Sequence, residues 1–309
     1  MIIRFNEDLT KQEIYANGDE LFQKMGLDMD GEGNRVYSYP KDREVYVATL
    51  ENPVLVTDNY KISLIESSTL RDTVYSLYST PLTTTEYDGT SIEFEQQKYR
   101  GVWGPSIDTL LFCKALKDMD LGGFKNGIEV GSGSGFISKY ILDKSDDIEG
   151  MTLIDMNKYA LDCAEYNIDD KRARFFAGDG LEFMKGKRYD MIICNPPYIP
   201  RPKSISDNPY EGLTLLNYLL TNASEHLREG GIFVTNISSM CEKITDETIK
   251  KTKLKGTVLE SKEVPLKVFN VLNNEKWMDY LLKERGLKEE RHDGYDYWQN
   301  INIMKFELE

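Results

Sequence analysis

The segment Asn195-Pro196-Pro197-Tyr198 follows the apolar run Met191–Cys194 and combines residue types suited to presenting a planar amino group for reaction. The two prolines fix φ and carry no N–H, and the residue before a proline is driven to extended geometry, so the segment is stiff and Asn195 is held in place. The Asn195 side-chain oxygen and the Pro196 carbonyl can accept the N–H groups of a delocalised –NH2, orient its nitrogen and stabilise the charge that develops on attack. The ring of Tyr198 can cover the planar group. Such a site needs no general base before attack, so we expect transfer of a group to the nitrogen without a catalytic histidine.

A glycine-rich turn is the second feature with a chemical use. The apolar run Ile128–Val130 leads into Gly131-Ser132-Gly133-Ser134-Gly135, and the acidic residue Glu129 precedes the turn. Glycines permit a tight turn and let the backbone approach a ligand closely, while the N–H groups of the following helix start point outward. Phe136 makes the spacing G-x-G-x-G, whereas a dinucleotide fingerprint needs G-x-G-x-x-G. The turn therefore predicts a nucleoside site of another class.

Two further carboxylates follow the next two apolar runs. Asp155 ends the run Met151–Ile154, 20 residues beyond Gly135, and can accept hydrogen bonds from both hydroxyls of a ribose. Asp179, followed by Gly180, comes after the run Arg174–Phe176 and is expected near the amino group of an adenine. Three successive strand ends with such residues favour one nucleoside-binding face over three unrelated turns.

These side chains meet only if the elements before them share one sheet. After residue 100 the chain alternates strand and helix, the pattern of a largely parallel sheet that binds ligands beyond the carboxyl ends of its strands. We expect strands at Ile128–Val130, Met151–Ile154, Arg174–Phe176, Met191–Cys194, Ile232–Asn236 and Tyr297–Leu308, and helices at Phe136–Leu142, Lys158–Ile168, Leu181–Met184, Leu213–Leu227 and Asn274–Arg285.

The first 95 residues have a different pattern of predicted helices and strands. Asp8–Met25 is predicted to be a helix, and short β-type runs follow at Glu44–Leu50, Pro53–Val56 and Ile62–Ile65, separated by turn signals. We therefore expect a small α+β amino-terminal domain over residues 1–95, with a role in substrate recognition, and a catalytic domain over residues 96–309.

Together, the glycine turn, the two aspartates and the Asn-Pro-Pro-Tyr motif resemble the class I S-adenosylmethionine-dependent methyltransferases. The resemblance implies a Rossmann-like α/β fold, with a seven-stranded, mostly parallel sheet covered by helices on both faces. It implies S-adenosylmethionine as cofactor and no metal. It places catalysis on Asn195, Pro196, Pro197 and Tyr198, and cofactor binding on Glu129, Gly131, Ser132, Gly133, Gly135, Asp155, Met156, Asp179, Gly180 and Asn195.

The stretch Val102–Leu111 resembles more specifically the Pro-x-x-Asp-Thr segment of release-factor glutamine methyltransferases. In that family the segment covers the methionine end of the cofactor, which adds Pro105, Asp108 and Thr109 to the cofactor site, with Ser106 expected to cap a helix. The first interpretation is thus a protein glutamine methyltransferase whose partner is a release factor. A nucleic-acid adenine or guanine methyltransferase and a small-molecule N-methyltransferase remain open as alternatives.

Composition narrows the classes of partner. The net charge of −14 argues against duplex nucleic acid, because phosphate binding depends mostly on cationic side chains. Lys185, Lys187 and Arg188 form a basic cluster that is expected near the active face, as are Arg201 and Lys203, and a solvated surface is the simpler explanation for each group. The four cysteines form no C-x-x-C pair, and the chain shows no leader and no apolar stretch of membrane-spanning length. We expect a cytoplasmic protein without a membrane partner.

Overall fold

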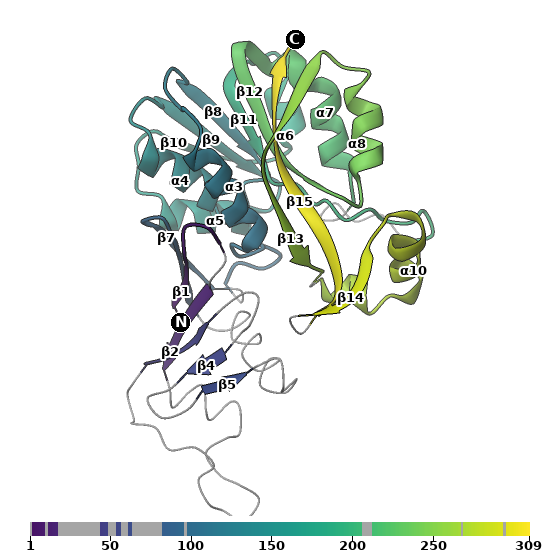
Figure 1. Ribbon diagram of the computed structural model, residues 1–309. Helices are drawn as coiled ribbons and strands as arrows, with labels where there is room; N and C mark the ends of the chain where they lie inside the picture. The colour runs from purple at the N-terminus through teal and green to yellow at the C-terminus, as the bar shows by residue number, and fades with distance from the viewer. Residues whose placement is uncertain are drawn as a thin grey trace, which may run out of the picture. The chain divides into compact units, whose positions relative to one another are not determined.

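The computed structural model describes residues 2–9, 12–17, 44–48, 54–56, 61–63, 82–95, 98–205, 212–266, 268–292 and 295–309. The chain divides into two compact units. One comprises Met1–Gly104 with His292–Gly294, and the other Pro105–Arg291 with Tyr295–Glu309 (Figure 1).

The amino-terminal unit contains a seven-stranded sheet in the order β5-β4-β3-β2-β1-β6-β7. All neighbouring strands are antiparallel except β1 and β6, which run parallel. The strands are β1 (Ile2–Phe5), β2 (Gln12–Asn17), β3 (Glu44–Ala48), β4 (Val54–Val56), β5 (Lys61–Ser63), β6 (Thr83–Tyr87) and β7 (Thr90–Phe94).

The helix predicted over Asp8–Met25 is wrong where the structure describes it. Gln12–Asn17 is strand β2, paired along its length with β1 on one side and β3 on the other. Strand β1 immediately precedes β2 in the chain, whereas β3 comes from a more distant part of the sequence, and pairing on both sides overrides a local apolar pattern of helical spacing. Residues 18–25 of that prediction lie outside the described residues.

The second unit confirms the predicted Rossmann-like sheet. Its strand order is β10-β9-β8-β11-β12-β15-β13, with β14 paired to β15 in addition. The first five strands are mutually parallel, whereas β15 is antiparallel to both β12 and β13. The strands are β8 (Asn126–Val130), β9 (Gly150–Asp155), β10 (Ala173–Ala177), β11 (Tyr189–Cys194), β12 (Leu227–Ser238), β13 (Leu254–Pro265), β14 (Lys288–His292) and β15 (Tyr295–Leu308).

Helices cover both faces of this sheet, as predicted. On one face α3 (Ile107–Lys117) packs against α4 (Phe136–Lys144) and crosses β12, β15 and β13, while α7 (Thr214–His226) and α8 (Glu242–Ile249) pack together on the other (Figure 1). The remaining helices are α5 (Lys158–Asn167), α6 (Gly180–Met184), α9 (Phe269–Leu272) and α10 (Glu275–Glu284).

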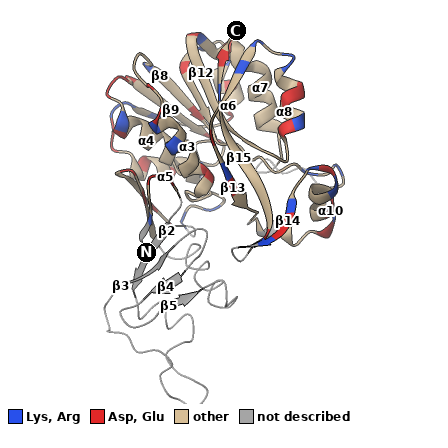
Figure 2. Ribbon diagram, in the orientation of Figure 1, with Lys and Arg blue, Asp and Glu red and all other residues tan. Residues whose placement is uncertain are grey.

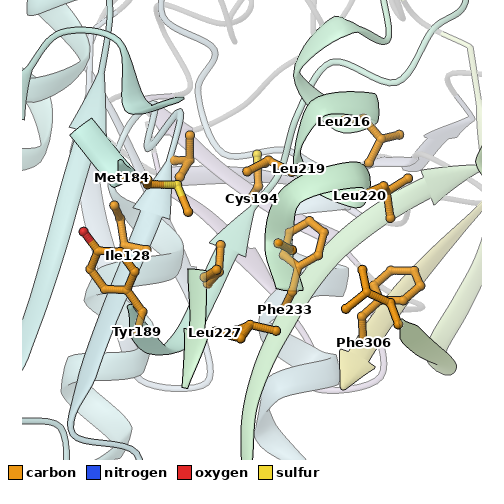
Figure 3. Close-up of a cluster of buried hydrophobic side chains, with 14 of the residues drawn as sticks. Ile128, Met184, Tyr189, Cys194, Leu216, Leu219, Leu220, Leu227, Phe233 and Phe306 are labelled. Carbon is orange, nitrogen blue, oxygen red and sulfur yellow. The ribbon is translucent and has the colours of Figure 1, made fainter. Parts of the chain in front are cut away.

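A hydrophobic cluster fixes the sheet against α6 and α7. Apolar side chains of β8, β11 and β12 face Leu216, Leu219 and Leu220 of α7, with Phe233 and Phe306 stacked at a ring-centroid distance of 5.8 Å (Figure 3). These residues are almost completely buried, and fully burying an aliphatic or aromatic side chain contributes about 1.5–3 kcal/mol. The cluster makes the carboxyl ends of the strands a rigid platform for the residues that follow them.

Candidate functional site

The carboxyl ends of the five parallel strands bring the predicted residues to one edge of the sheet. The glycine turn follows β8, Asp155 ends β9, Asp179 follows β10 and Asn195 follows β11. The pairing of these strands in parallel register means that their ends align, as expected from sequence.

The side-chain amide of Asn195 has a hydrogen-bond partner at its nitrogen but none at its oxygen within the described residues. Its Nδ2 donates to Oδ2 of Asp108 at 3.2 Å, although the two residues are 87 positions apart in sequence. Its Oδ1 is buried and has no hydrogen-bond partner among the described residues. A carboxylate can only accept hydrogen bonds, so Asp108 fixes the orientation of the Asn195 amide and turns Oδ1 away from itself. Oδ1 of Asn195 is therefore a buried, oriented hydrogen-bond acceptor that can still receive a donor.

Helix α3 brings Asp108 to this position. Ser106 is the N-cap of the helix, as predicted, and its backbone N–H donates to Oγ1 of Thr109 at 3.3 Å. The Ser106 hydroxyl also donates to Oδ1 of Asp108, so each carboxylate oxygen of Asp108 has a partner. Pro105, directly before the cap, is half-buried.

The loop after Asn195 is anchored by a residue that sequence reasoning gave no role. Trp277 of α10 donates from Nε1 to the Pro200 carbonyl at 2.8 Å, in a buried environment. Ile199 and Ile205 pack against the cluster that contains Trp277. Asn274 caps α10 by accepting from the Trp277 backbone N–H at 3.1 Å. The segment that carries the motif is therefore fixed from outside as well as by its own prolines.

Tyr198 is half-buried as a residue, while its hydroxyl is desolvated. Burial, with a further contribution from the negative charge of Asp108, raises the pKa of Tyr198 well above its ordinary value. The phenol therefore stays neutral, and the electrostatic effect of Asp108 shows that Tyr198 lies near that carboxylate.

The glycine turn folds back onto the end of β9. The backbone N–H groups of Gly131 and Ser132 donate to the Ile154 carbonyl at 2.8 and 3.2 Å, and that of Gly133 donates to Oδ2 of Asp155 at 3.0 Å. Gly133 has φ 53°, and no atom lies within 4 Å of the place where a Cβ would stand. At Gly135, with φ 79°, a Cβ would lie 2.7 Å from Cβ of Ala164. Gly133 thus leaves open space above the turn, whereas Gly135 permits close packing of α5.

Asp155 is prepared as a hydrogen-bond acceptor. Its Oδ1 accepts the backbone N–H of Asn157 at 2.8 Å, and its Oδ2 accepts that of Gly133. Burial nevertheless raises its pKa. A carboxylate has about four acceptor positions, so lone pairs remain for ribose hydroxyls. With the open space at Gly133, this carboxylate fits the nucleoside part of S-adenosylmethionine.

Three further residues were predicted to bind the cofactor: Met156, Asp179 and Gly180. Met156, the next residue, is 67% exposed. Asp179 is exposed and caps α6 by accepting the Leu181 backbone N–H at 2.8 Å, and Gly180 is buried against Val130.

Glu129 faces a helix. It is 2% exposed, and its Oε2 accepts the backbone N–H of Ser138 at 3.1 Å and also the Ser138 hydroxyl, both from α4. Burial raises the pKa of Glu129 from 4.5 to about 8. The structure therefore gives Glu129 a contact that fixes α4 beneath the turn.

Asn236, near the end of β12, is a polar residue at this edge that sequence reasoning treated only as part of a strand. It is 0% exposed, and both Oδ1 and Nδ2 lack a partner within the described parts of the chain. The signal in the sequence was a polar pair, Thr235-Asn236, that interrupts the apolar run starting at Ile232.

The basic cluster does not lie at this edge, which corrects the expectation. Lys185, Lys187 and Arg188 connect α6 to the start of β11 and so lie at the amino end of that strand. Lys185 pairs with Glu182 at 2.6 Å, and the Lys187 ammonium lies 3.2 Å from the ring centroid of Phe183. Elsewhere, acidic and basic residues are interspersed on α8, α10 and β14 (Figure 2).

Comparison with known proteins places the second unit in a recognised class. Residues 106–260 match the family model described as the methyltransferase small domain. A protein of Methanocaldococcus jannaschii, provisionally named a protein N5-glutamine methyltransferase, is 26% identical over 200 residues, which cover 61% of this chain and 96% of the relative. The release factor glutamine methyltransferase of Aquifex aeolicus is 27% identical, over 43% of this chain and 53% of the relative. The chain thus spans about half the length of that second relative.

Other relatives are named for nucleic-acid substrates. A tRNA1(Val) (adenine(37)-N6)-methyltransferase of a Flavobacteriaceae bacterium is 27% identical, over 52% of this chain and 71% of the relative. Among solved structures, the M. jannaschii tRNA m1G37 methyltransferase aligns with a TM-score of 0.47 at 14% identity, over 74% of this chain and 54% of that chain.

The described residues contain neither a membrane-spanning helix nor a cluster of metal-binding side chains. None of the helices there has the length and apolar character to cross a bilayer. No group of three or more His, Cys, Asp or Glu side chains in those residues is arranged to hold a metal ion.

Proposed function

Because the chain belongs to the methyltransferase small domain family and is an S-adenosylmethionine-dependent methyltransferase, we propose that it methylates the side-chain amide nitrogen of a glutamine in a protein. A translation protein of the release-factor type is the substrate that the relatives' names favour.

One observation carries the proposal: Oδ1 of Asn195 is buried, oriented by Asp108 and without a partner in the described chain. A buried acceptor without a donor costs about 1–3 kcal/mol, which an incoming N–H group removes. An amide –NH2 supplies such a donor and presents its nitrogen in a fixed plane. In this proposal Asn195 holds the nitrogen in place and stabilises the positive charge that develops on it.

The remaining residues hold the two reactants. The cofactor supplies an electrophilic methyl group when bound. We assign the ribose to Asp155, the close backbone approach to Gly131 and Gly133, and the adenine edge to Asp179, with Met156 beside it. Asp108 contributes by orienting Asn195, and the ring of Tyr198 covers the planar amide.

A nucleobase amino group is the second candidate acceptor. It is also a planar –NH2, and relatives named for tRNA and for ribosomal RNA match parts of this chain. The charge of −14 and the position of Lys185, Lys187 and Arg188, away from the site edge, favour the protein substrate.

The test uses methyl-labelled S-adenosylmethionine with two matched peptides. One carries a Gly-Gly-Gln turn, and in the other glutamate replaces the glutamine, which removes the –NH2 and little else. We expect labelling of the first peptide alone, with the added methyl group located on the glutamine by mass spectrometry. Structured RNA is offered in a parallel reaction, and label that entered RNA but neither peptide would refute the glutamine assignment.

A further inference from the structure

Asn236 is a buried amide whose hydrogen bonds are not made within the described chain. The side chain is 0% exposed, and neither Oδ1 nor Nδ2 has a partner there. Buried amides in folded proteins are nearly always paired, because an unpaired one keeps its full desolvation penalty. This side chain can therefore still form hydrogen bonds with a group that is not part of the described chain.

The strand register places Asn236 beside Asn195. Cys194, the last residue of β11, and Thr235 of β12 are Cα partners in the parallel pair, so Asn236 is the next residue of β12 and Asn195 directly follows the end of β11. Neighbouring strands lie about 4.8 Å apart, and paired residues of a parallel sheet point to the same face. The two asparagines therefore project from adjacent strand ends.

The face is the one that carries α3. Phe233 and Ile237 belong to the cluster packed on α7, and alternation along β12 sends Asn236 to the opposite face. There its register partner is Ile303 of β15, and the partner of Ile303 is Glu260 of β13. Glu260 accepts from Lys114 of α3 at 3.2 Å, which fixes that face as the α3 side.

Helix α3 is also the helix whose Asp108 holds Asn195. Two unsatisfied amides, those of Asn195 and Asn236, thus share one face and one end of the sheet, beneath the same helix.

We propose that Asn236 is a second acceptor-binding residue, which donates from Nδ2 to the carbonyl oxygen of the amide that Asn195 engages. This inference rests on the proposed function. A primary carboxamide carries one acceptor oxygen and one –NH2 in a single plane, and a donor from Asn236 with an acceptor from Asn195 complements both. An amine lacks the oxygen and a carboxylate lacks the N–H groups, so the pair selects a carboxamide over either.

The test variant is Asn236→Leu, which keeps the size of the side chain and removes both hydrogen-bonding atoms. With the Gly-Gly-Gln peptide we expect kcat/KM to fall by about 10–100-fold, the effect of losing one desolvated hydrogen bond. Cofactor affinity should stay within about twofold of wild type, and the melting temperature should not fall, because an unpaired buried amide is replaced by an apolar group. Asn236→Asp donates only when protonated, so it should be as impaired as Asn236→Leu at high pH, where the carboxylate is ionised, and should recover as pH falls.

Thr235→Val is the matched control. Thr235 is equally buried, its Oγ1 also lacks a partner in the described chain, and it lies on the opposite face of β12. We expect wild-type kcat/KM from it.

Four results would overturn the proposal. Undiminished peptide labelling by Asn236→Leu refutes it while leaving the proposed function intact. Equal losses in Asn236→Leu and Thr235→Val show a packing effect instead. Activity of Asn236→Asp that stays at the wild-type level at high pH refutes the donor role. Wild-type labelling of RNA and not of the peptide refutes the glutamine assignment and the carboxamide pairing with it.

Discussion

Asn195→Ala should separate the chemistry from cofactor binding. The variant removes the one oriented acceptor at the end of β11, Oδ1 of Asn195, which has no other task in the described chain. Losing one preorganised transition-state contact costs about 2.7–4 kcal/mol, so we expect the single-turnover rate to fall about 10²–10³-fold. Cofactor affinity should change by less than about twofold, because Asp155 and the glycine turn are untouched.

Asn195→Asp is informative because of Asp108. A carboxylate at this position can accept from –NH2, but it would lie within hydrogen-bonding distance of the Asp108 carboxylate, where Nδ2 of Asn195 now lies at 3.2 Å. Two carboxylates this close share one proton. The protonated pair reproduces the wild-type pattern, with a donor toward Asp108 and an acceptor toward the substrate. We therefore expect Asn195→Asp to recover activity as pH falls, which Asn195→Ala cannot do.

The assay is single-turnover methyl transfer to the Gly-Gly-Gln peptide, with calorimetric titration of S-adenosylmethionine on the same preparations. Asp108→Asn serves as a companion variant, since a neutral amide permits both orientations of Asn195 and should cost less than Asn195→Ala. If Asn195→Ala transferred methyl at the wild-type rate, the motif would be a structural turn and the assignment of Asn195 would be wrong.

Three further predictions concern the residues around this centre. Asp155→Ala should weaken S-adenosylmethionine binding by about 1.5–3 kcal/mol in calorimetric titration, because charged acceptors to the ribose are lost; unchanged affinity would remove Asp155 from the site. Glu129 has a folded-state pKa of about 8 against 4.5, so it contributes stability at low pH that is lost as pH rises through 8. Glu129→Gln should therefore be more stable than wild type at pH 9 by about 2–5 kcal/mol and show no such gain at pH 4, by denaturant titration without cofactor. Trp277→Phe keeps most of the packing but leaves the Pro200 carbonyl without its 2.8 Å donor, so unfolding should become easier by about 1–3 kcal/mol, and an unchanged unfolding midpoint would contradict the anchoring role.

The parallel half of the sheet could be predicted from sequence because its signals are local. Strands β8, β9 and β11 are apolar runs that end at or directly before their candidate residues, so the run, the turn and the candidate residue fall within a few positions. The cap at Ser106 was predictable for the same reason. The roles of these residues in binding and catalysis remain predictions.

Other contacts depend on partners that sequence spacing does not reveal. The bond between Asn195 and Asp108 spans 87 residues, and Trp277 reaches Pro200 from a helix in a later part of the chain. Strand β2 was mistaken for a helix because its apolar residues have helical spacing, and one of its two ladder partners, β3, is remote in sequence. Asn236 appeared to be one polar residue in a strand until the register set it beside Asn195.

The position of β15 has a consequence for the order in which the protein assembles. Strands β8, β9 and β10 pair in the order in which they follow one another along the chain, so the part of the sheet that bears the glycine turn and Asp155 can form early. Strand β12, by contrast, lies between β11 and β15, and β13 has no place in the sheet until β15 separates it from β12. Until residues 295–308 are available, one edge of β12 is open to mispairing, with Asn236 on it. The part of the site that lies on β12, with Asn236, is therefore completed later than the nucleoside face on β8 and β9.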